Sequence, residues 1–257
     1  MISPLSYVSP QAKLGRNVFV SPFATIEDKV EIGDNCWIGP NVVIMNYTKI
    51  GNNCKIFPGA VIGAEPQDLK FKGEESTVEI GNYTTIREFV TIHRGTSDKM
   101  TTQIGDHCLI MAYVHVAHDC IIGNHVILAN NVALSGHIMI EDYAIIEGMS
   151  AAQQFITIGK HAFVAGASLI RKSVPPYVRC AREPLQYIGV NTVGLTRRGF
   201  TPEQIKHIED IYRIIYVKGY NLQKALEIVE NEVPDSVFRQ EILSFIRQQK
   251  DGVIKGI

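Results

Sequence analysis

One aliphatic side chain returns every six residues through most of this chain. From Val8 to Ile170, each sixth position is apolar, with Asp68, Glu74 and Asp98 as the exceptions. A repeat this regular is typical of a solenoid, in which each coil packs only on its neighbours and the stack buries one continuous core.

Each six-residue unit reads as a short strand followed by a bend. The residue two places before the aliphatic is small or β-branched, as at Ala24, Val42 and Val126, so two inward side chains flank one outward side chain. The next two residues favour Asn, Asp, Gly, Pro and His. Asn, Asp and His tolerate the left-handed backbone conformation of a bend. A strand and a bend every six residues close a triangular coil after roughly 18 residues.

Composition favours a protein without nucleic-acid or membrane partners. The 257 residues are 46% hydrophobic, and their formal net charge of −1 gives no overall attraction to nucleic acid or to a membrane surface. The chain has neither a signal-peptide pattern at its start nor an apolar run long enough for a transmembrane helix, so we expect a cytoplasmic protein. Four cysteines fall at the small inward position and should be buried reduced thiols: Cys36, Cys54, Cys108 and Cys120. Cys180 lies beyond the repeats and has no assigned role.

The repeat is interrupted twice. Residues 64–78 and 93–103 lose the aliphatic pattern and are polar and charged. Long excursions from a solenoid either reach toward a ligand or partner, or are tolerated surface insertions. The residues alone leave both interpretations open.

The last third of the chain has helical spacing. The β-helix should end at VPPY, residues 174–177, because two prolines there cannot donate ladder hydrogen bonds. Three residues beyond it predict helix starts, the first strengthened by a following proline: Thr201, Asn221 and Asp235. We therefore expect a β-helical domain over residues 1–176, and a connector with a small helical domain over residues 177–257.

The heptapeptide VHVAHDC departs from the plain repeat. Its valines take inward positions, so His115 faces outward from a flat wall, while His118 and Asp119 take the two bend positions of a corner. Stacking at the coil period places Gly136 over His118 and His137 over Asp119. A carboxylate that orients an imidazole prepares it as a general base, and an amide uncovered by a side chain can stabilise an oxyanion. A plain turn role for Asp119 is equally open, because asparagines fill the same bend position elsewhere.

Several segments together resemble one family. They are VHVAHDC, TIHRG (91–95), QDLK (67–70), LSGH (134–137), VPPY and GVNTVGLTRRGF (189–200), and the resemblance covers essentially the whole chain. This set is similar to the UDP-N-acetylglucosamine 3-O-acyltransferases, which catalyse the first step of lipid A biosynthesis. The resemblance implies a left-handed parallel β-helix of hexapeptide repeats followed by a small C-terminal α-helical domain. It also implies a homotrimer with active sites between neighbouring β-helices.

Matching the family motif residue by residue implies a role for each position. His118 would take the proton from the 3-hydroxyl of the glucosamine, whose oxygen attacks the thioester of a 3-hydroxyacyl chain on acyl carrier protein. Asp119 would orient His118, and Gly136 would supply the oxyanion amide. The remaining matches would bind substrate: His115 and His137 at the sugar, Gln67, Asp68, Lys70 and Gln154 along the nucleotide-sugar cleft, and Asn191, Arg197 and Arg198 at the uridine diphosphate. No metal or cofactor is implied.

The resemblance also bears on chain length. Gly166 matches the family position that measures the acyl chain, and without a side chain there we expect a preference for long 3-hydroxyacyl chains, on the order of 14 carbons or more. Three positions depart from the family pattern at the substrate site, and none is the proposed base: Gln153, Pro184 and Val193. The residues leave open whether the acceptor carries a 3-hydroxyl or a 3-amino group.

A basic segment suits the acidic carrier partner. Residues 171–218 contain nine basic and four acidic side chains, a net charge of +5 that leaves about −6 for the rest of the chain. Such a patch favours steered docking of an acidic protein, although an ordinary solvated face is the alternative.

Other classes fit less well. A γ-class carbonic anhydrase would share the fold, but its zinc ligands include a histidine pair with a wider spacing than His115 and His118 have. An ice-binding β-helix would need flat threonine ladders, whereas the outward positions here are mixed. An N-acyltransferase of the same pathway usually carries an additional N-terminal domain, whereas these repeats begin by Val8.

Overall fold

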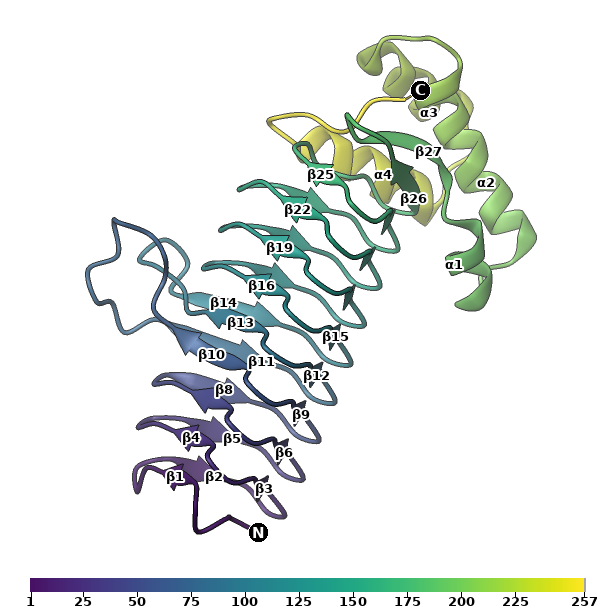
Figure 1. The fold of residues 1–257 in the computed structure, drawn as a ribbon. Coiled ribbons are helices and arrows are strands. Elements are labelled where there is room, and N and C mark those ends of the chain that lie inside the picture. Colours follow the sequence, from purple (N-terminus) through teal and green to yellow (C-terminus); the bar gives the residue numbers. More distant parts are fainter. Residues whose placement is uncertain (257) are drawn as a thin grey trace.

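The computed structural model describes residues 1–256, which form a three-sided parallel β-helix with helices gathered at its C-terminal end (Figure 1). Successive strands fall in rotation on three sheets, so each regular coil gives one strand to each sheet. Neighbouring coils pair in parallel register, His115 with Ala133 and Ala133 with Ala151. The predicted triangular coil is therefore confirmed.

The chain enters the first, the second and the third sheet in turn. The first sheet contains β1 (Tyr7–Val8), β4 (Thr25–Ile26), β7 (Val43–Ile44), β10 (Val61–Ala64), β13 (Thr91–His93), β16 (His115–Val116), β19 (Ala133–Leu134), β22 (Ala151–Ala152) and β25 (Leu169–Ile170). The second sheet contains β2 (Lys13–Leu14), β5 (Glu31–Ile32), β8 (Thr48–Ile50), β11 (Thr77–Ile80), β14 (Thr101–Ile104), β17 (Ile121–Ile122), β20 (Met139–Ile140) and β23 (Thr157–Ile158). The third sheet contains β3 (Phe19–Val20), β6 (Trp37–Ile38), β9 (Lys55–Ile56), β12 (Thr85–Ile86), β15 (Leu109–Ile110), β18 (Ile127–Leu128), β21 (Ile145–Ile146), β24 (Phe163–Val164), β26 (Val178–Ala181) and β27 (Gln186–Val190).

The repeating aliphatics form the core. Ile26, Ile44 and Ile62 stack along the first sheet without solvent exposure. Burial of one such side chain contributes roughly 1.5–3 kcal/mol to folding. All five cysteines are buried free thiols, as predicted for the four in the repeats, and Cys180 lies buried in β26. The β-helix is thus held by one continuous apolar column.

The bends take the backbone conformation that their residues predict. The second bend residue has a positive φ, as at Asn35 (59°) and His107 (56°). At the corner before the third sheet, Asp or Asn oxygens accept a hydrogen bond from a backbone N–H of the coil below, as from Arg16 N to Asp34 (2.7 Å). A Cβ on Gly81, which precedes one of these bends, would lie 2.6 Å from the backbone of Gly105. Close stacking therefore requires glycine there.

The two interruptions emerge at a single corner, the one between the first and second sheets. One loop joins β10 to β11 and the other joins β13 to β14. In Figure 1 they project together from one edge of the β-helix. The bend that contains His118 and Asp119, between β16 and β17, lies at this same corner.

The third sheet continues past the predicted end of the β-helix at residues 174–177. β26 pairs in parallel with β24, and β27 then pairs with β26 in antiparallel fashion. The two prolines therefore do not stop the sheet, because they occupy the turn before β26 and donate to no ladder. The division into domains at residue 176 remains a prediction.

Within the described residues 1–256, four α-helices and one π-helical turn follow. They are α1 (Thr192–Arg197), α2 (Pro202–Tyr212), η1 (Arg213–Val217), α3 (Leu222–Glu232) and α4 (Val237–Gln248). Thr201 caps α2 in a capping box, and Asn221 caps α3, as predicted. The predicted cap Asp235 is wrong. Ser236 caps α4 instead, accepting from Arg239 N, while Asp235 accepts side-chain hydrogen bonds from Arg239 and Gln240.

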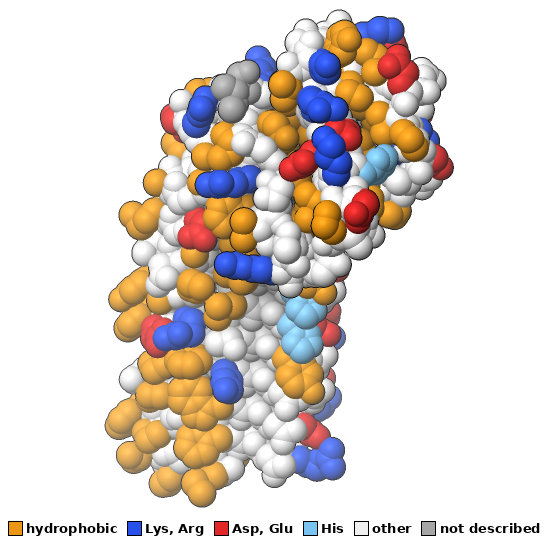
Figure 2. Space-filling view, turned by 90° about the vertical axis from the view of Figure 1, so that its right-hand side faces the viewer, with side chains coloured by type: hydrophobic (Ala, Val, Ile, Leu, Met, Phe, Trp, Pro, Cys, Tyr) orange, Lys and Arg blue, Asp and Glu red, His pale blue; other side chains and the backbone are white. Residues whose placement is uncertain are grey.

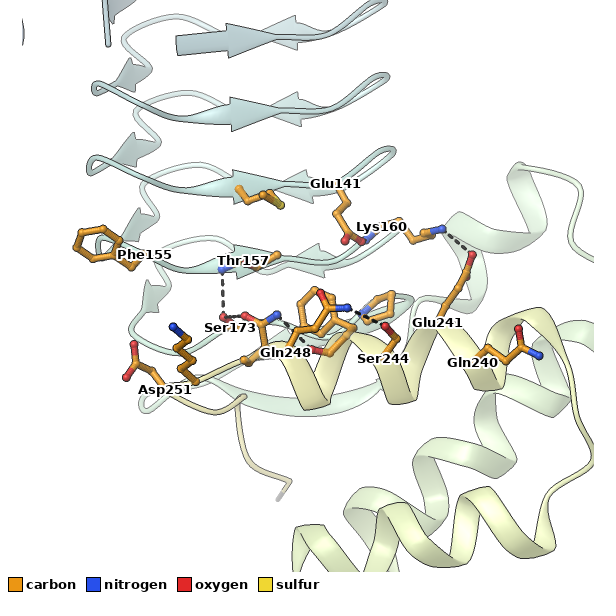
Figure 3. Close-up of a pocket in the computed structure, with 15 residues that line it drawn as sticks. Glu141, Phe155, Thr157, Lys160, Ser173, Gln240, Glu241, Ser244, Gln248 and Asp251 are labelled. Carbon is orange, nitrogen blue, oxygen red and sulfur yellow. Dashed lines mark hydrogen bonds and ion pairs between the residues drawn. The ribbon is translucent and has the colours of Figure 1, made fainter. Parts of the chain in front are cut away.

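The helices pack against the end of the β-helix through a few specific contacts. Tyr212 is fully buried and donates to the carbonyl of Pro176 at 2.6 Å. Between β20, β23 and α4 lies a cavity of about 750 Å³ (Figure 3), bordered at one edge by the ion pair of Lys160 with Glu241 at 2.7 Å. None of the helices within residues 1–256 has the length and apolar character needed to cross a bilayer.

Candidate functional site

His118 and Asp119 are held at their corner by the core on either side. Val116 before them and Cys120 after them are fully buried, which fixes the bend between two short strands. Asp119 takes the left-handed conformation (φ 59°) common to the second bend residue. Unlike most bend residues, both side chains are buried, with exposures of 6% for His118 and 0% for Asp119. Thr96 and Lys99 of the loop over residues 93–103 lie over Asp119, while Gly136 and His137 lie against the His118 ring.

Asp119 is a carboxylate surrounded by donors. His118 Nδ1 lies 2.8 Å from Asp119 Oδ2. Thr96 donates to the carboxylate from its amide (3.0 Å to Oδ1) and from its hydroxyl (2.6 Å to Oδ2), and Lys99 donates its amide at 3.2 Å. Burial alone would raise the pKa of Asp119, but the hydrogen bonds from Thr96, His118 and Lys99 outweigh it and hold the pKa below its usual value. The pair is therefore an ionised carboxylate that orients an imidazole.

Gly136 lies directly over the His118 ring. A Cβ placed on Gly136 would lie 2.5 Å from His118 Cε1 and 2.7 Å from Nε2, so only glycine lets the ring stay where it is. Because Nδ1 is engaged with Asp119, Nε2 is the nitrogen free to exchange a proton. Across residues 1–256, the Gly136 N–H donates to no protein acceptor. A proton acceptor and a free amide thus lie side by side.

His137 closes the cluster from the coil above. Its ring packs edge-to-face on His118, with ring centroids 5.0 Å apart. Its Nδ1 lies 3.1 Å from Asp98 Oδ2, and its Nε2 lies 3.8 Å from Asp119 Oδ2. Phe155, one coil further, stacks on its other face at 4.6 Å.

Two histidines on the neighbouring wall have lowered pKa values. His115 faces outward from the wall, as predicted, and shares a 2.8 Å hydrogen bond with Thr91 Oγ1. Burial lowers the pKa of His115. His93 packs edge-to-face on His115 at 4.9 Å, and burial, with the nearby His115 and His118, lowers its pKa to about 4. Both shifts favour the neutral form of these two polar rings beside His118.

The cluster also has donor types that bind metals. Atoms of His118, Asp119 and His137 lie within 4.8 Å of one another. The Asp119 oxygens, however, already accept hydrogen bonds from Thr96, Lys99 and His118. The hydrogen-bonded pair accounts for the geometry, and the absence of a metal or cofactor remains a prediction.

The other residues predicted for this region lie at the same corner but apart from the dyad. Gln154 is exposed one coil above Gly136. On the loop over residues 64–78, Gln67 and Lys70 are exposed and Asp68 is half-buried. Asp68 accepts hydrogen bonds from Lys70 and Phe71 within its own loop.

The predicted diphosphate residues lie at a second corner, the one between the second and third sheets. Arg198 donates to the carbonyl of Tyr143 at 3.0 Å, and desolvation lowers its pKa. The Asn191 amide is already engaged, accepting from Gly194 N as the cap of α1 and donating to His161 O at 2.9 Å. Arg197 is exposed. Stacked rings run along this corner: Tyr83, His107, His125, Tyr143, His161 and Tyr177. Figure 2 shows histidine side chains gathered on the β-helix below the helices.

Gly166 lies at the third corner, between the third and first sheets. It is exposed, and a Cβ there would meet only the Gly148 carbonyl oxygen at 3.2 Å and the Glu147 side chain at 3.7 Å. One chain therefore places His118, Arg198 and Gly166 at three different corners of the prism. It does not bring the predicted parts of the site together.

Sequence reasoning missed the residues that support Asp119. Thr96 and Lys99 lie in an interruption without the repeat, where the period gives no register. His93 stands in the segment TIHRG, but the six-residue repeat does not predict that its side chain is buried.

Comparison with known proteins gives consistent matches. Residues 174–254 match the family model described as Udp N-acetylglucosamine O-acyltransferase; Domain 2, and residues 29–64 and 101–136 match the bacterial transferase hexapeptide model. An acyl-[acyl-carrier-protein]--UDP-N-acetylglucosamine O-acyltransferase of Burkholderia lata is 42% identical over 65% of this chain and 64% of its own length. One of Burkholderia mallei is 39% identical over 76% of this chain and 77% of its own.

Solved structures agree with these matches. A UDP-N-acetylglucosamine acyltransferase from Bacteroides fragilis superposes with a TM-score of 0.98 at 49% identity, covering 99% of this chain and 100% of that one. The enzyme from Francisella novicida superposes with a TM-score of 0.96 at 39% identity, covering 99% and 94%. With the hexapeptide match, these structures confirm the predicted left-handed parallel β-helix with C-terminal helices.

Proposed function

The chain belongs to the UDP-N-acetylglucosamine O-acyltransferase family and is an acyltransferase, and from this premise we propose its substrates and mechanism. It transfers a 3-hydroxyacyl chain from acyl carrier protein to the 3-hydroxyl of UDP-N-acetylglucosamine, in lipid A biosynthesis. The observation that carries the proposal is the His118 ring held between Asp119 and the bare amide of Gly136.

His118 acts as the general base in this proposal. Its Nε2 accepts the proton of the sugar 3-hydroxyl as that oxygen forms a bond to the thioester carbonyl carbon. Asp119, bonded to Nδ1, holds the ring orientation and stabilises the imidazolium. When the tetrahedral intermediate collapses, the C–S bond breaks and the imidazolium returns the proton to the departing thiolate.

Gly136 acts on the carbonyl oxygen. Negative charge develops there in the intermediate, and a fixed N–H without a protein acceptor can stabilise it. Because Gly136 and His118 touch, one bound carbonyl can meet the attacking oxygen and the amide together.

A homotrimer would complete the site, because copies packed corner to corner can supply the parts that one chain keeps apart. An exposed apolar column supports this assembly. Phe23, Phe89, Tyr113 and Met149 occupy one bend column beside Gly166 with exposures of 62%, 52%, 57% and 68%. Figure 2 shows hydrophobic side chains gathered over the N-terminal coils. Patches of this kind commonly mark subunit contacts.

The column also gives a matched test of assembly. Asn41 and Asn131 occupy the same bend position as Phe89 and Tyr113. The double variant Phe89→Asn, Tyr113→Asn should therefore keep its coils while the sedimentation mass falls from trimer toward monomer. A variant that stays trimeric would contradict this contact.

The activity test uses purified protein, UDP-N-acetylglucosamine and a ladder of 3-hydroxyacyl carrier proteins, read by mass spectrometry. A parallel reaction with a 3-amino acceptor tells O-transfer from N-transfer. His118→Ala should lose about 10²- to 10⁴-fold in turnover. Its melting temperature should fall by a few degrees, because the hydrogen bond of His118 to the buried Asp119 carboxylate is lost. His107→Asn, at another corner, should keep full activity. A loss below tenfold in His118→Ala would show that His118 is not the base.

A further inference from the structure

The loop over residues 93–103 is tied to the active-site carboxylate. Thr96 is 7% exposed, and its amide and hydroxyl both donate to Asp119. The Lys99 amide adds another hydrogen bond, and the turn between them is closed by Met100 N donating to Thr96 O at 2.8 Å. Thr96 and Lys99 of the interruption thus both bind the carboxylate of Asp119, which belongs to the proposed dyad.

Thr96 and His118 share one oxygen of this carboxylate. The Thr96 hydroxyl lies 2.6 Å from Asp119 Oδ2, and His118 Nδ1 lies 2.8 Å from the same atom. Because two donors share the negative charge of one oxygen, the hydrogen bond from Thr96 weakens the one from His118, and the reverse also holds. The position of the carboxylate and its strength toward the imidazole therefore depend on the Thr96 hydroxyl.

We propose that Thr96 is a positioning residue of the acyl transfer, which fixes the Asp119 carboxylate through its hydroxyl and thereby sets how strongly His118 holds a proton. This rests on the proposed function, because it assumes that His118 is the base. Through this contact the loop over residues 93–103 becomes a part of the catalytic apparatus rather than a tolerated insertion.

The direction of the pH effect follows from the pKa of Asp119, which the Thr96 hydrogen bonds help to lower after burial has raised it. A carboxylate whose pKa is lowered in the folded state stabilises the fold above its unfolded pKa, and this contribution is lost as the pH falls. Without the hydroxyl, the carboxylate binds a proton more readily and also holds the imidazolium more tightly. Both effects move the acidic limb of the rate profile to higher pH.

Loss of the Thr96 hydroxyl would leave the other titratable residues around the dyad in place. His93 and His115 face it from the wall, His137 and Asp98 from above and from the loop, Lys99 from the loop, and Cys120 follows in the chain. Burial raises the pKa of the Cys120 thiol to about 12, so it stays protonated in the working range.

The test compares three variants. Thr96→Val removes the hydroxyl at nearly constant volume, and Thr96→Ser keeps it. Thr102→Val is the matched control, because Thr102 is buried like Thr96, and its hydroxyl accepts from the Asp119 backbone N–H at 2.9 Å rather than donating to the carboxylate. Thr102→Val should cost stability and leave the pH profile in place.

We expect Thr96→Val to lower kcat about tenfold and to move the acidic limb of kcat/KM up by roughly one pH unit, since the lost bond involves a charged group. Thr96→Ser should restore both. If Thr96→Val and Thr102→Val both melt at a lower temperature and both keep the wild-type pH dependence of kcat/KM, Thr96 has only a structural role and the proposal is wrong.

A second readout needs no substrate. The ring signals of His118, assigned by their absence in His118→Ala, are followed by NMR against pH in all three variants. The midpoint of this titration should move to higher pH in Thr96→Val and in neither of the other two variants. If wild type proves inactive, the proposed function fails, while this titration still decides whether Thr96 controls the dyad.

Discussion

Gly136→Ala tests the geometry of the dyad with one methyl group. The added Cβ would lie 2.5 Å from His118 Cε1 and 2.7 Å from Nε2, whereas ordinary contact begins near 3.4 Å. The ring must therefore retreat by about 1 Å, a displacement that can cost on the order of 10²-fold in rate. The backbone itself is not strained, because φ at Gly136 is not positive.

Stability should fall less than activity. Retreat of the ring weakens the bond of His118 with Asp119, a hydrogen bond to a charged group worth about 1.5–3 kcal/mol. The alanine also restricts the unfolded chain, which raises the free energy of unfolding by about 0.4–1 kcal/mol. A fall of a few degrees in melting temperature, measured by circular dichroism, is expected.

The assay is turnover of UDP-N-acetylglucosamine with 3-hydroxyacyl carrier protein, in single and double variants. In a His118→Ala background, Gly136→Ala should add almost nothing, because the ring that it displaces is gone. The reasoning is refuted if Gly136→Ala keeps more than a tenth of wild-type turnover. It is also refuted if the two losses multiply, which would place Gly136 and His118 in independent roles.

Further predictions concern other parts of the molecule. Arg198→Ala should raise KM for the nucleotide sugar about tenfold or more with kcat little changed; an unchanged KM in steady-state kinetics would count against its diphosphate role. Gly166→Met should fold, because a Cβ there has room, and should shift the optimum across the carrier ladder to shorter chains; the same optimum would mean that another residue measures the chain. Burial raises the pKa of Glu141, so the charged carboxylate lowers the free energy of unfolding at neutral pH. This cost disappears below about pH 4, where the carboxyl is protonated in both the folded and the unfolded chain. Glu141→Gln should therefore melt a few degrees higher at pH 7 and equally at pH 4, and a lower melting temperature at pH 7 would contradict this.

The period of the repeat predicted most of the fold, because one physical requirement recurs at every coil. An inward aliphatic such as Ile44 or Leu128 has no other place in a triangular coil, and a bend such as Asn35 needs a residue that tolerates positive φ. The caps Thr201 and Asn221 were equally local. The cap predicted at Asp235 was wrong because the hydroxyl of its neighbour Ser236 can accept the same capping hydrogen bond one residue closer to the helix.

The site was predictable only where it coincides with the repeat. Stacking by coils placed Gly136 over His118 correctly, as the contact between them shows. Thr96 lies outside the period, so its approach to Asp119 depends on how a loop folds back and not on any spacing. The fully engaged amide of Asn191 also depends on tertiary structure, because its partner His161 lies 30 residues away.

The protein contains a single tryptophan, and its location limits what an emission experiment reports. Trp37 lies in β6, near the N-terminal end of the stack, with its ring 5.1 Å from Phe57. In a structure whose coils contact only their neighbours, the ends can fray before the middle does. Its fluorescence would therefore follow the opening of the first coils and be silent about the corner that contains His118. Melting curves followed by tryptophan fluorescence and by circular dichroism should therefore have different midpoints. The difference between the midpoints would measure how independently the two ends of the β-helix unfold.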